Sequence, residues 1–152
     1  MNLIITPQEV IDLAFSREEL VHRDVVTELD IAEAESRYIR PILGEALAEA
    51  IAAGGYMELR SEYVAPALAA WCRYVVEPLL AARCREMHHD DRSSAENEHL
   101  RGVVRSLKRK ASTLSRRLSD HLNAHGDDYA EYNPKTNPLN RCFIYGNIVQ
   151  VY

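Results

Sequence analysis

The sequence predicts a mainly α-helical protein, a helical bundle of four to five helices that continues into an extended, strand-like C-terminal arm. Apolar side chains recur every three or four residues over two long stretches, 61–87 and 100–122. The final segment, CFIYGNIVQVY, is instead rich in β-branched and aromatic side chains, which favour strands. With 152 residues, 47% of them hydrophobic and 27% charged, the chain has the composition of one globular domain. We expect a helical domain over residues 1–126 and an extended loop and arm over 127–152.

Helix-start signals mark the first two helices. Thr6 is followed by Pro7 at the first helical position and by Glu9 three residues on, which is the pattern of a capping box. The second helix is expected to begin near Thr27 or Asp30, just before another run of helix-favouring residues.

Proline and glycine divide the segment that follows. A break is predicted at Pro41, because proline disfavours helical backbone in the residue before it and removes a hydrogen bond. After Gly44 a short helix resumes and is predicted to end at the glycine pair 54–55.

The first long helix is predicted from Ser61 to about Met87, centred near Trp71. Pro66 can be accommodated in its first turn. Pro78 lies inside the pattern, and its ring would displace the carbonyl of the residue four positions earlier, so a kink is expected near Tyr74.

The second long helix follows the polar segment HHDDRSS, where Ser93 and Glu96 offer a further capping box. A single apolar seam runs along it, through Leu100, Val103, Leu107, Ala111, Leu114, Leu118 and Leu122. We expect Leu107, Leu114 and Leu118 to lie in the core together with Trp71.

The same helix carries an unusual charge distribution. The segment 99–119 holds seven cations and no acid: Arg101, Arg105, Lys108, Arg109, Lys110, Arg116 and Arg117. The remaining 131 residues carry 11 cations and 23 acids, a net charge of −12, whereas the whole chain has a net charge of −5. Such asymmetry favours contacts between complementary protein surfaces, or with an anionic partner, although a solvated helix face also gives this pattern.

The tail changes in character after Gly126. Two Asn-Pro pairs predict turns or extended chain, and the strand signal follows them. A lone strand cannot satisfy its own backbone, so its partner is the N-terminal segment MNLII, a hairpin folded at 145–147, or a strand of another subunit. The residues expected to make partner contacts are Arg101, Arg105, Lys108, Arg109, Arg116 and Arg117 of the basic helix and Phe143, Tyr145, Ile148 and Val151 of the tail.

The residue patterns do not favour an enzyme, and no catalytic, cofactor or metal site is predicted. The segment 88–91, HHDD, is the densest set of possible metal ligands, with Cys84 one turn earlier, but adjacent residues rarely converge on one ion. His121 and His125 could share a helix face, yet the glutamate of a HExxH motif is absent. Phosphate loops and nucleophile elbows are also lacking.

The compartment is also suggested by the sequence. The three cysteines, Cys72, Cys84 and Cys142, are widely spaced and odd in number, as expected of reduced intracellular thiols. The N-terminus lacks the pattern of a signal peptide, and prolines and charges interrupt the apolar stretches, so no membrane span or membrane partner is expected.

A nucleic-acid role is the alternative reading of the basic helix. Clustered lysine and arginine suit phosphate contacts, so a helical regulatory protein could use residues 101–117 on nucleic acid. The cations lack interleaved aromatic residues, and no short turn joins this helix to the preceding one as in a helix-turn-helix. We therefore expect at most non-specific contact with DNA.

The segment IAEAESRYIRPILGEALAEAI resembles the small head-tail connector, or head-completion, proteins of tailed bacteriophages and prophages. The matching residues of the helix, the hydrophobic-Leu-Gly turn and the following short helix are Ala32, Glu33, Ile39, Leu43, Gly44, Leu47 and Ile51. The opening ITPQEV, the long central helix and the extended C-terminal arm agree with the same plan, most clearly over the first 90 residues.

The resemblance implies a non-catalytic structural protein of the virion, assembled in the cytoplasm of the host bacterium. Its subunits would form a ring at the portal vertex, contacting the portal and tail-side proteins. A ring requires two different surfaces on each subunit, and an acidic body with one basic helix is compatible with that requirement.

Overall fold

The chain is mainly α-helical, as predicted, with five helical stretches among the described residues when directly contiguous helices are taken together. In the computed structural model the described backbone comprises residues 2–15, 23–88, 94–145 and 148–151. The helices are α1 (Pro7–Ala14); α2 (Glu28–Ala34) continuing through the π turn η2 (Glu35–Ile39) into α3 (Arg40–Leu43); α4 (Glu45–Ala52); α5 (Met57–Leu59) continuing through the π turn η3 (Arg60–Val64) into α6 (Ala65–His88); and α7 (Ser94–Ala124). Short 3₁₀ turns cover Arg23–Val25, Gly126–Asp128 and Pro138–Asn140.

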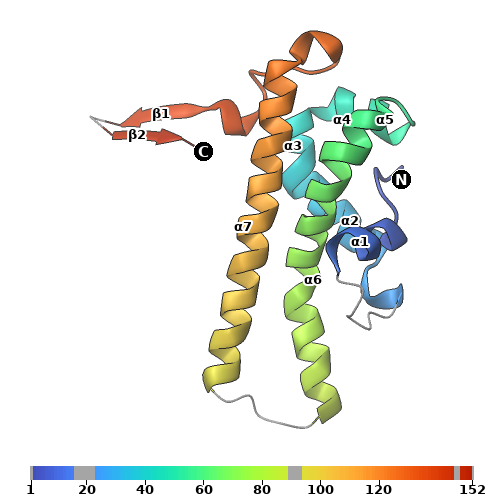
Figure 1. Cartoon of the computed structure of the whole chain (residues 1–152), viewed down its shortest axis with the longest axis vertical. Helices are drawn as coiled ribbons and strands as arrows, with labels where there is room; N and C mark the ends of the chain where they lie inside the picture. The colour runs from blue at the N-terminus through green and yellow to red at the C-terminus, as the bar shows by residue number, and fades with distance from the viewer. Residues whose placement is uncertain (1, 16–22, 89–93, 146–147, 152) are drawn as a thin grey trace.

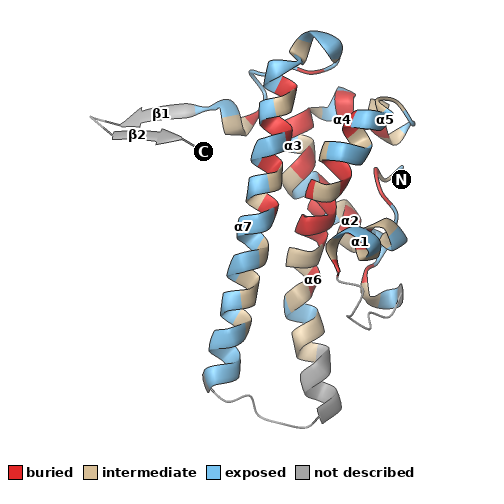
Figure 2. Cartoon of the chain, viewed as in Figure 1, coloured by how far each residue is buried: buried red, intermediate tan, exposed pale blue. Residues whose placement is uncertain are grey.

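The two longest helices, α6 and α7, run side by side as the frame of the molecule, as expected from the sequence (Figure 1). Helices α1 and α2 pack against α6. Buried residues concentrate where α3 and α4 approach α6 and α7 (Figure 2). In the far half of the α6–α7 pair, the residues whose burial is described are mostly exposed or half-buried. The core therefore occupies one end of the long pair.

Both expected helix starts are confirmed in atomic detail. The Glu9 backbone N–H donates to Thr6 Oγ1 at 3.3 Å, and the Thr6 N–H donates to Glu9 Oε2 at 2.8 Å. The same reciprocal box joins Thr27 and Asp30, which fixes Thr27 as the residue that begins the second helix. The Ser93 cap lies outside the described residues.

The predicted break at Pro41 is wrong, because the helix continues through this proline to Leu43 and ends at Gly44. Gly44 has a φ of 80°, a conformation that glycine adopts without the steric penalty of a side chain. The later helix also begins earlier than Ser61, at Met57, so Pro66 lies within continuous helix. Helix α6 continues through Pro78, and the kink near Tyr74 remains a prediction.

Each of the two π turns ends two residues before a proline. The Arg40 N–H donates to the Glu35 carbonyl just before Pro41, and the Ala65 N–H donates to the Arg60 carbonyl just before Pro66. A proline ring in an α-helix collides with the carbonyl four residues earlier, and a wider turn relieves that collision. The π turns thus account for Pro41 and Pro66, whereas Pro78 lies within α-helix.

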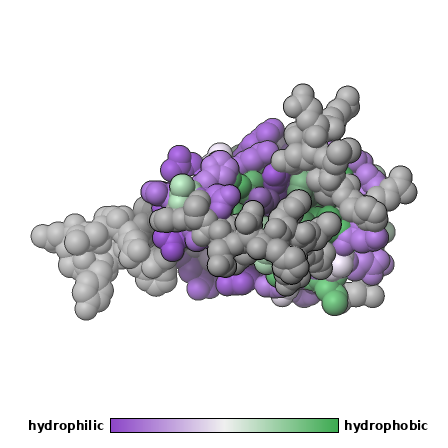
Figure 3. Space-filling view, turned by 90° about the horizontal axis from the view of Figure 1, so that it is seen from below, coloured by the Kyte–Doolittle hydropathy of each residue, from purple (hydrophilic) through white to green (hydrophobic). Residues whose placement is uncertain are grey.

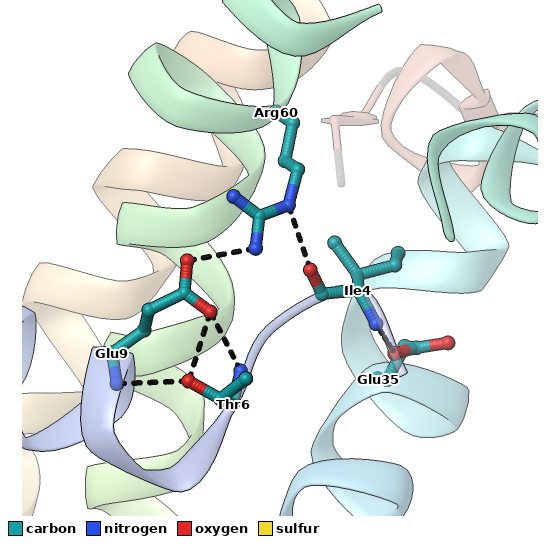
Figure 4. A network of polar contacts seen from close by, with 5 residues as sticks. All are labelled: Ile4, Thr6, Glu9, Glu35 and Arg60. Atoms are coloured by element: carbon teal, nitrogen blue, oxygen red, sulfur yellow. Dashed lines mark hydrogen bonds and ion pairs between the residues drawn. The ribbon is translucent and has the colours of Figure 1, made fainter. Parts of the chain in front are cut away.

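The first residue of each π turn also holds the N-terminal segment (Figure 4). The Ile4 N–H donates to Glu35 Oε2 at 3.1 Å, and Arg60 Nε donates to the Ile4 carbonyl at 2.8 Å. The Arg60 guanidinium also pairs with Glu9 at 2.7 Å. Burial alone would raise the pKa of Glu9, but the hydrogen bonds from Thr6 and Arg60 lower it overall.

The predicted seam of α7 is only partly core. Leu118, Leu122 and Ala111 are buried, as is Trp71 on α6, but Leu107 and Leu114 are half-buried. The expectation that Leu107 and Leu114 lie in the core is therefore wrong. Leu107 belongs to the stretch 95–110 of α7, in which every residue is exposed or half-buried.

The segment after α7 folds back onto that helix through amide and hydroxyl groups. Asn137 is fully buried and donates from Nδ2 to Ser119 Oγ at 2.8 Å. The Tyr132 hydroxyl donates to Asn123 Oδ1 at 2.8 Å, and the Asn140 Nδ2 donates to the same oxygen at 2.9 Å. The loop over 127–141 is thus anchored along the end of α7.

The tail forms an antiparallel hairpin, one of the three pairings left open by the sequence. Strand β1 (Cys142–Tyr145) pairs with β2 (Ile148–Val151), with Tyr145 opposite Ile148 and Cys142 opposite Val151. The hairpin extends sideways from the end of α7, away from the helices (Figure 1).

One helical stretch among the described residues, Met57–Ala82, is long and apolar enough to cross a membrane. Half of its most apolar window is buried inside the protein. The core helix of a globular protein has the same length and composition, so this finding is weak evidence for a membrane span.

Candidate interaction surface

Five of the predicted contact residues form one stripe along α7, hereafter the basic stripe. Arg101, Arg105, Lys108, Arg109 and Arg116 are all exposed. Their spacing places them within about 100° of one another around the helix and along about 22 Å of its length. Lys110 and Arg117 fall on another side of α7.

The charges of the basic stripe are not neutralised by acidic side chains among the described residues. Within the described part of the chain, none of its five cations forms an ion pair, and each remains open to solvent. Arg117 differs, because its guanidinium lies over the Tyr63 ring at 5.0 Å from the ring centre. Like charges spaced along one helix face repel each other weakly, so an anionic partner would relieve that repulsion.

The stripe ends at a pocket between five elements, hereafter the Trp71 groove. Residues of η2, α3, α6, α7 and the Pro138–Asn140 turn enclose about 410 Å³. Its apolar lining consists of Tyr38, Pro41, Ile42, Trp71, Pro138 and Leu139. Arg37 and Arg116 add two exposed guanidinium groups to the lining, and Ser112 and Ser115 add hydroxyls.

The groove has a rigid floor. The rings of Tyr38 and Trp71 are stacked, with centres 3.8 Å apart and planes 4° from parallel. The Trp71 indole Nε1 donates to Ser115 Oγ at 2.8 Å. Because the indole is held by both contacts, the aromatic surface is positioned before any partner binds.

The histidine pair on α7 makes contacts within the protein. His121 and His125 are stacked with ring centres 4.5 Å apart, and His121 Nε2 lies 2.8 Å from the Tyr129 hydroxyl. Burial, and to a smaller extent the neighbouring His125, lowers the pKa of His121 despite nearby carboxylates. No cluster of three or more potential metal ligands occurs among the described residues.

The other sequence-derived candidates lie where side chains are not described. These are the possible metal ligands Cys84, His88, His89, Asp90 and Asp91, and the tail residues Phe143, Tyr145, Ile148 and Val151. Cys72 is a buried free thiol, and burial raises the pKa of this cysteine to about 12, so it is unreactive.

The groove and its arginine Arg37 were not predicted from the sequence. Its residues come from four separate parts of the chain, and Tyr38 and Trp71 appear in the sequence only as members of apolar helix faces. Exposed large hydrophobic residues are few in the described chain: Leu13, Leu29, Met57 and Leu79. Seen along the long axis, the coloured surface is mostly hydrophilic with small, separate hydrophobic areas (Figure 3).

Part of the chain is similar to a protein family. Residues 84–141 match a family of unknown function (DUF6712). This match includes all of α7, with the basic stripe, and the loop that folds back onto it, and it covers less than half of the chain. No curated protein and no solved structure matches the chain.

Proposed function

We propose that this protein is a head-tail connector of a tailed phage or prophage, a structural virion protein that assembles as a ring at the portal vertex. The proposal starts from the resemblance over residues 31–51. The arrangement of that segment supports it, because α3 and α4 meet at Gly44 and the matching residues Leu43, Leu47 and Ile51 are buried.

The observation that carries the proposal is the C-terminal hairpin. A two-stranded hairpin is at best marginally stable by itself, and its outer edges keep unpaired backbone donors and acceptors. Here the hairpin extends from the helical body rather than lying along it (Figure 1). A neighbouring subunit or virion protein that pairs with this edge would complete the sheet.

The charge distribution supports assembly through unlike surfaces. The basic stripe is exposed on α7, while the rest of the chain is strongly acidic. In a ring each subunit offers one surface to the preceding neighbour and a different one to the next. Complementary charges would set the register of that contact and disfavour pairing of like surfaces.

The test is the size and shape of the full chain in solution. Light scattering coupled to gel filtration over a concentration series, with electron microscopy of the concentrated protein, is expected to show closed rings. A protein that stays monomeric at every concentration would contradict the ring proposal.

A parallel measurement addresses the nucleic-acid alternative. Fluorescence anisotropy with a duplex DNA, in salt from about 0.05 to 0.2 M, reports how many phosphate contacts are made. We expect weak binding that disappears toward the upper end of this range. Submicromolar binding at physiological salt, combined with a monomeric state, would favour a nucleic-acid-associated regulatory protein using residues 101–117.

A further inference from the structure

The Trp71 groove has the composition of a site for an apolar side chain flanked by acids. Its floor is the stacked pair of Tyr38 and Trp71, with Ile42 and Leu139 beside it. Among the described residues that line it, Arg37 and Arg116 are the charged ones, and no carboxylate is present. An apolar side chain of a partner would pack on the stacked rings. Acidic side chains on either side of it would form ion pairs with the two arginines.

Arg37 and Arg116 can form ion pairs with such acids while losing little stabilisation within their own subunit. Arg116 forms no ion pair within the described residues, and Arg37 pairs only loosely with Glu33, at 3.7 Å. Both members of that pair are largely exposed, with side chains 65% and 56% accessible. Exposed ion pairs of this kind contribute little to stability, so exchanging one for a contact between subunits is nearly neutral.

The first turn of α2 carries the matching features. Leu29 is 80% exposed, more than Leu13, Met57 or Leu79. Glu28 precedes it directly, and Glu33 lies one helical turn further on the same face; both glutamates are exposed. An exposed leucine alone is ordinary, but this one combines high exposure with acids on both sides.

We propose that the Trp71 groove of one subunit receives Leu29 of a second copy of this chain, with Glu28 and Glu33 of that copy facing Arg37 and Arg116. The proposal rests on the proposed ring and specifies one of its contacts. Leu29 does not line the groove, so the Leu29 of one copy can bind the groove of the next and the contact can continue from copy to copy.

The experiment uses two single variants of the full chain, each folded by circular dichroism. Leu29→Ser removes the anchor, and Arg116→Glu places a like charge opposite the incoming glutamates. Each is expected to weaken self-association about tenfold to hundredfold, the effect of losing one buried leucine or one complementary charge. Leu79→Ser and Lys110→Glu, which alter exposed residues outside the groove, serve as matched controls and should assemble normally.

Mixing the two variants gives the sharper test. The Leu29→Ser subunit keeps an intact groove and the Arg116→Glu subunit keeps an intact Leu29, so one contact can form between them. We expect the mixture to form heterodimers and nothing larger, although each variant alone is monomeric at the same concentration. Arg116→Glu combined with Glu33→Arg in one chain should recover part of the self-association.

The outcomes separate this contact from the ring itself. If the wild type forms rings and both single variants do too, the proposed contact is wrong and the ring stands. If the wild type is monomeric, the ring and the contact fail together. Loss of DNA binding in Arg116→Glu, with Leu29→Ser indistinguishable from wild type in every assay, would assign the groove to an anionic ligand instead.

Discussion

The Trp71 indole and the Ser115 hydroxyl join the two long helices through one hydrogen bond, 2.8 Å long and buried between α6 and α7. Ser115→Ala would remove the hydrogen-bond partner of the indole N–H, and both residues are buried. We expect a loss of about 1–3 kcal/mol in the free energy of unfolding, measured by urea denaturation. Ser106→Ala, at an exposed position of the same helix, is the control and should change stability little. An equally stable Ser115→Ala protein would mean that the indole finds another acceptor.

Substitutions of two leucines of α7 should differ in their effect on stability, because one leucine is buried and the other is half-buried. Leu118 is fully buried, so Leu118→Ala is expected to lower the free energy of unfolding by about 2–5 kcal/mol. Leu107 is half-buried, and Leu107→Ala should cost clearly less. Urea denaturation of both variants measures the difference. Equal losses would show that a third element covers the far half of the helix pair in solution.

The basic stripe is predicted to act mainly in protein contacts. Reversing Arg105, Arg109 and Arg116 to Glu should impair self-association in gel filtration while leaving the helical circular dichroism unchanged. Arg109→Ala alone should barely alter stability, because an isolated exposed charge contributes little. Tight DNA binding at about 0.15 M salt, where charges are screened beyond about 8 Å, would contradict this assignment if the triple reversal abolished it.

Deleting residues 142–152 tests whether the hairpin is needed for folding of the subunit or for its assembly. The helical core lies elsewhere in the molecule, so the shortened protein should keep its helical circular dichroism and a cooperative thermal transition. It should no longer form oligomers, because the edge offered to the neighbour is gone. Unfolding of the shortened protein would instead show that the hairpin supports its own subunit.

His121 should make stability depend on pH in the mildly acidic range. Burial lowers the pKa of His121 in the folded protein, so the unfolded chain, with a value near 6.5, binds the proton first as the pH falls. Stability is therefore lost as the pH falls through about 6.5, and the loss levels off below the folded pKa. Urea denaturation of wild type and His121→Gln from about pH 8 to about pH 5 measures this dependence. The free energy of unfolding should fall less in the variant than in wild type. Parallel pH profiles would assign the dependence to other groups.

The features predicted correctly from the sequence are those that depend on neighbouring residues. The boxes at Thr6 and Thr27 need only a side chain three positions away, and the two long helices follow from regular apolar spacing. The end of the second helix was misplaced at Pro41, because the π turn that accommodates this proline has no simple sequence signal.

At the candidate interaction surface, too, local features could be predicted from the sequence and contacts across the fold could not. The exposure of Arg105 and Arg109 follows from a charged helix face, which is a local property. The half-burial of Leu107 depends instead on which elements cover α7. The Trp71 groove likewise requires Tyr38, Trp71 and Leu139 to meet across the fold, and a single sequence gives no distance between them.

The two π turns also determine the winding of the helices that contain them. A π turn takes up one residue more than an α turn, and one residue corresponds to about 100° of rotation around a helix. If the turn before Pro66 rewound as an α turn, Arg60 would rotate by about that angle and lose the Ile4 carbonyl. The same rewinding before Pro41 would carry Glu35 away from the Ile4 N–H. The π turns before Pro41 and Pro66 thus set the positions of the two side chains that bind the backbone of Ile4.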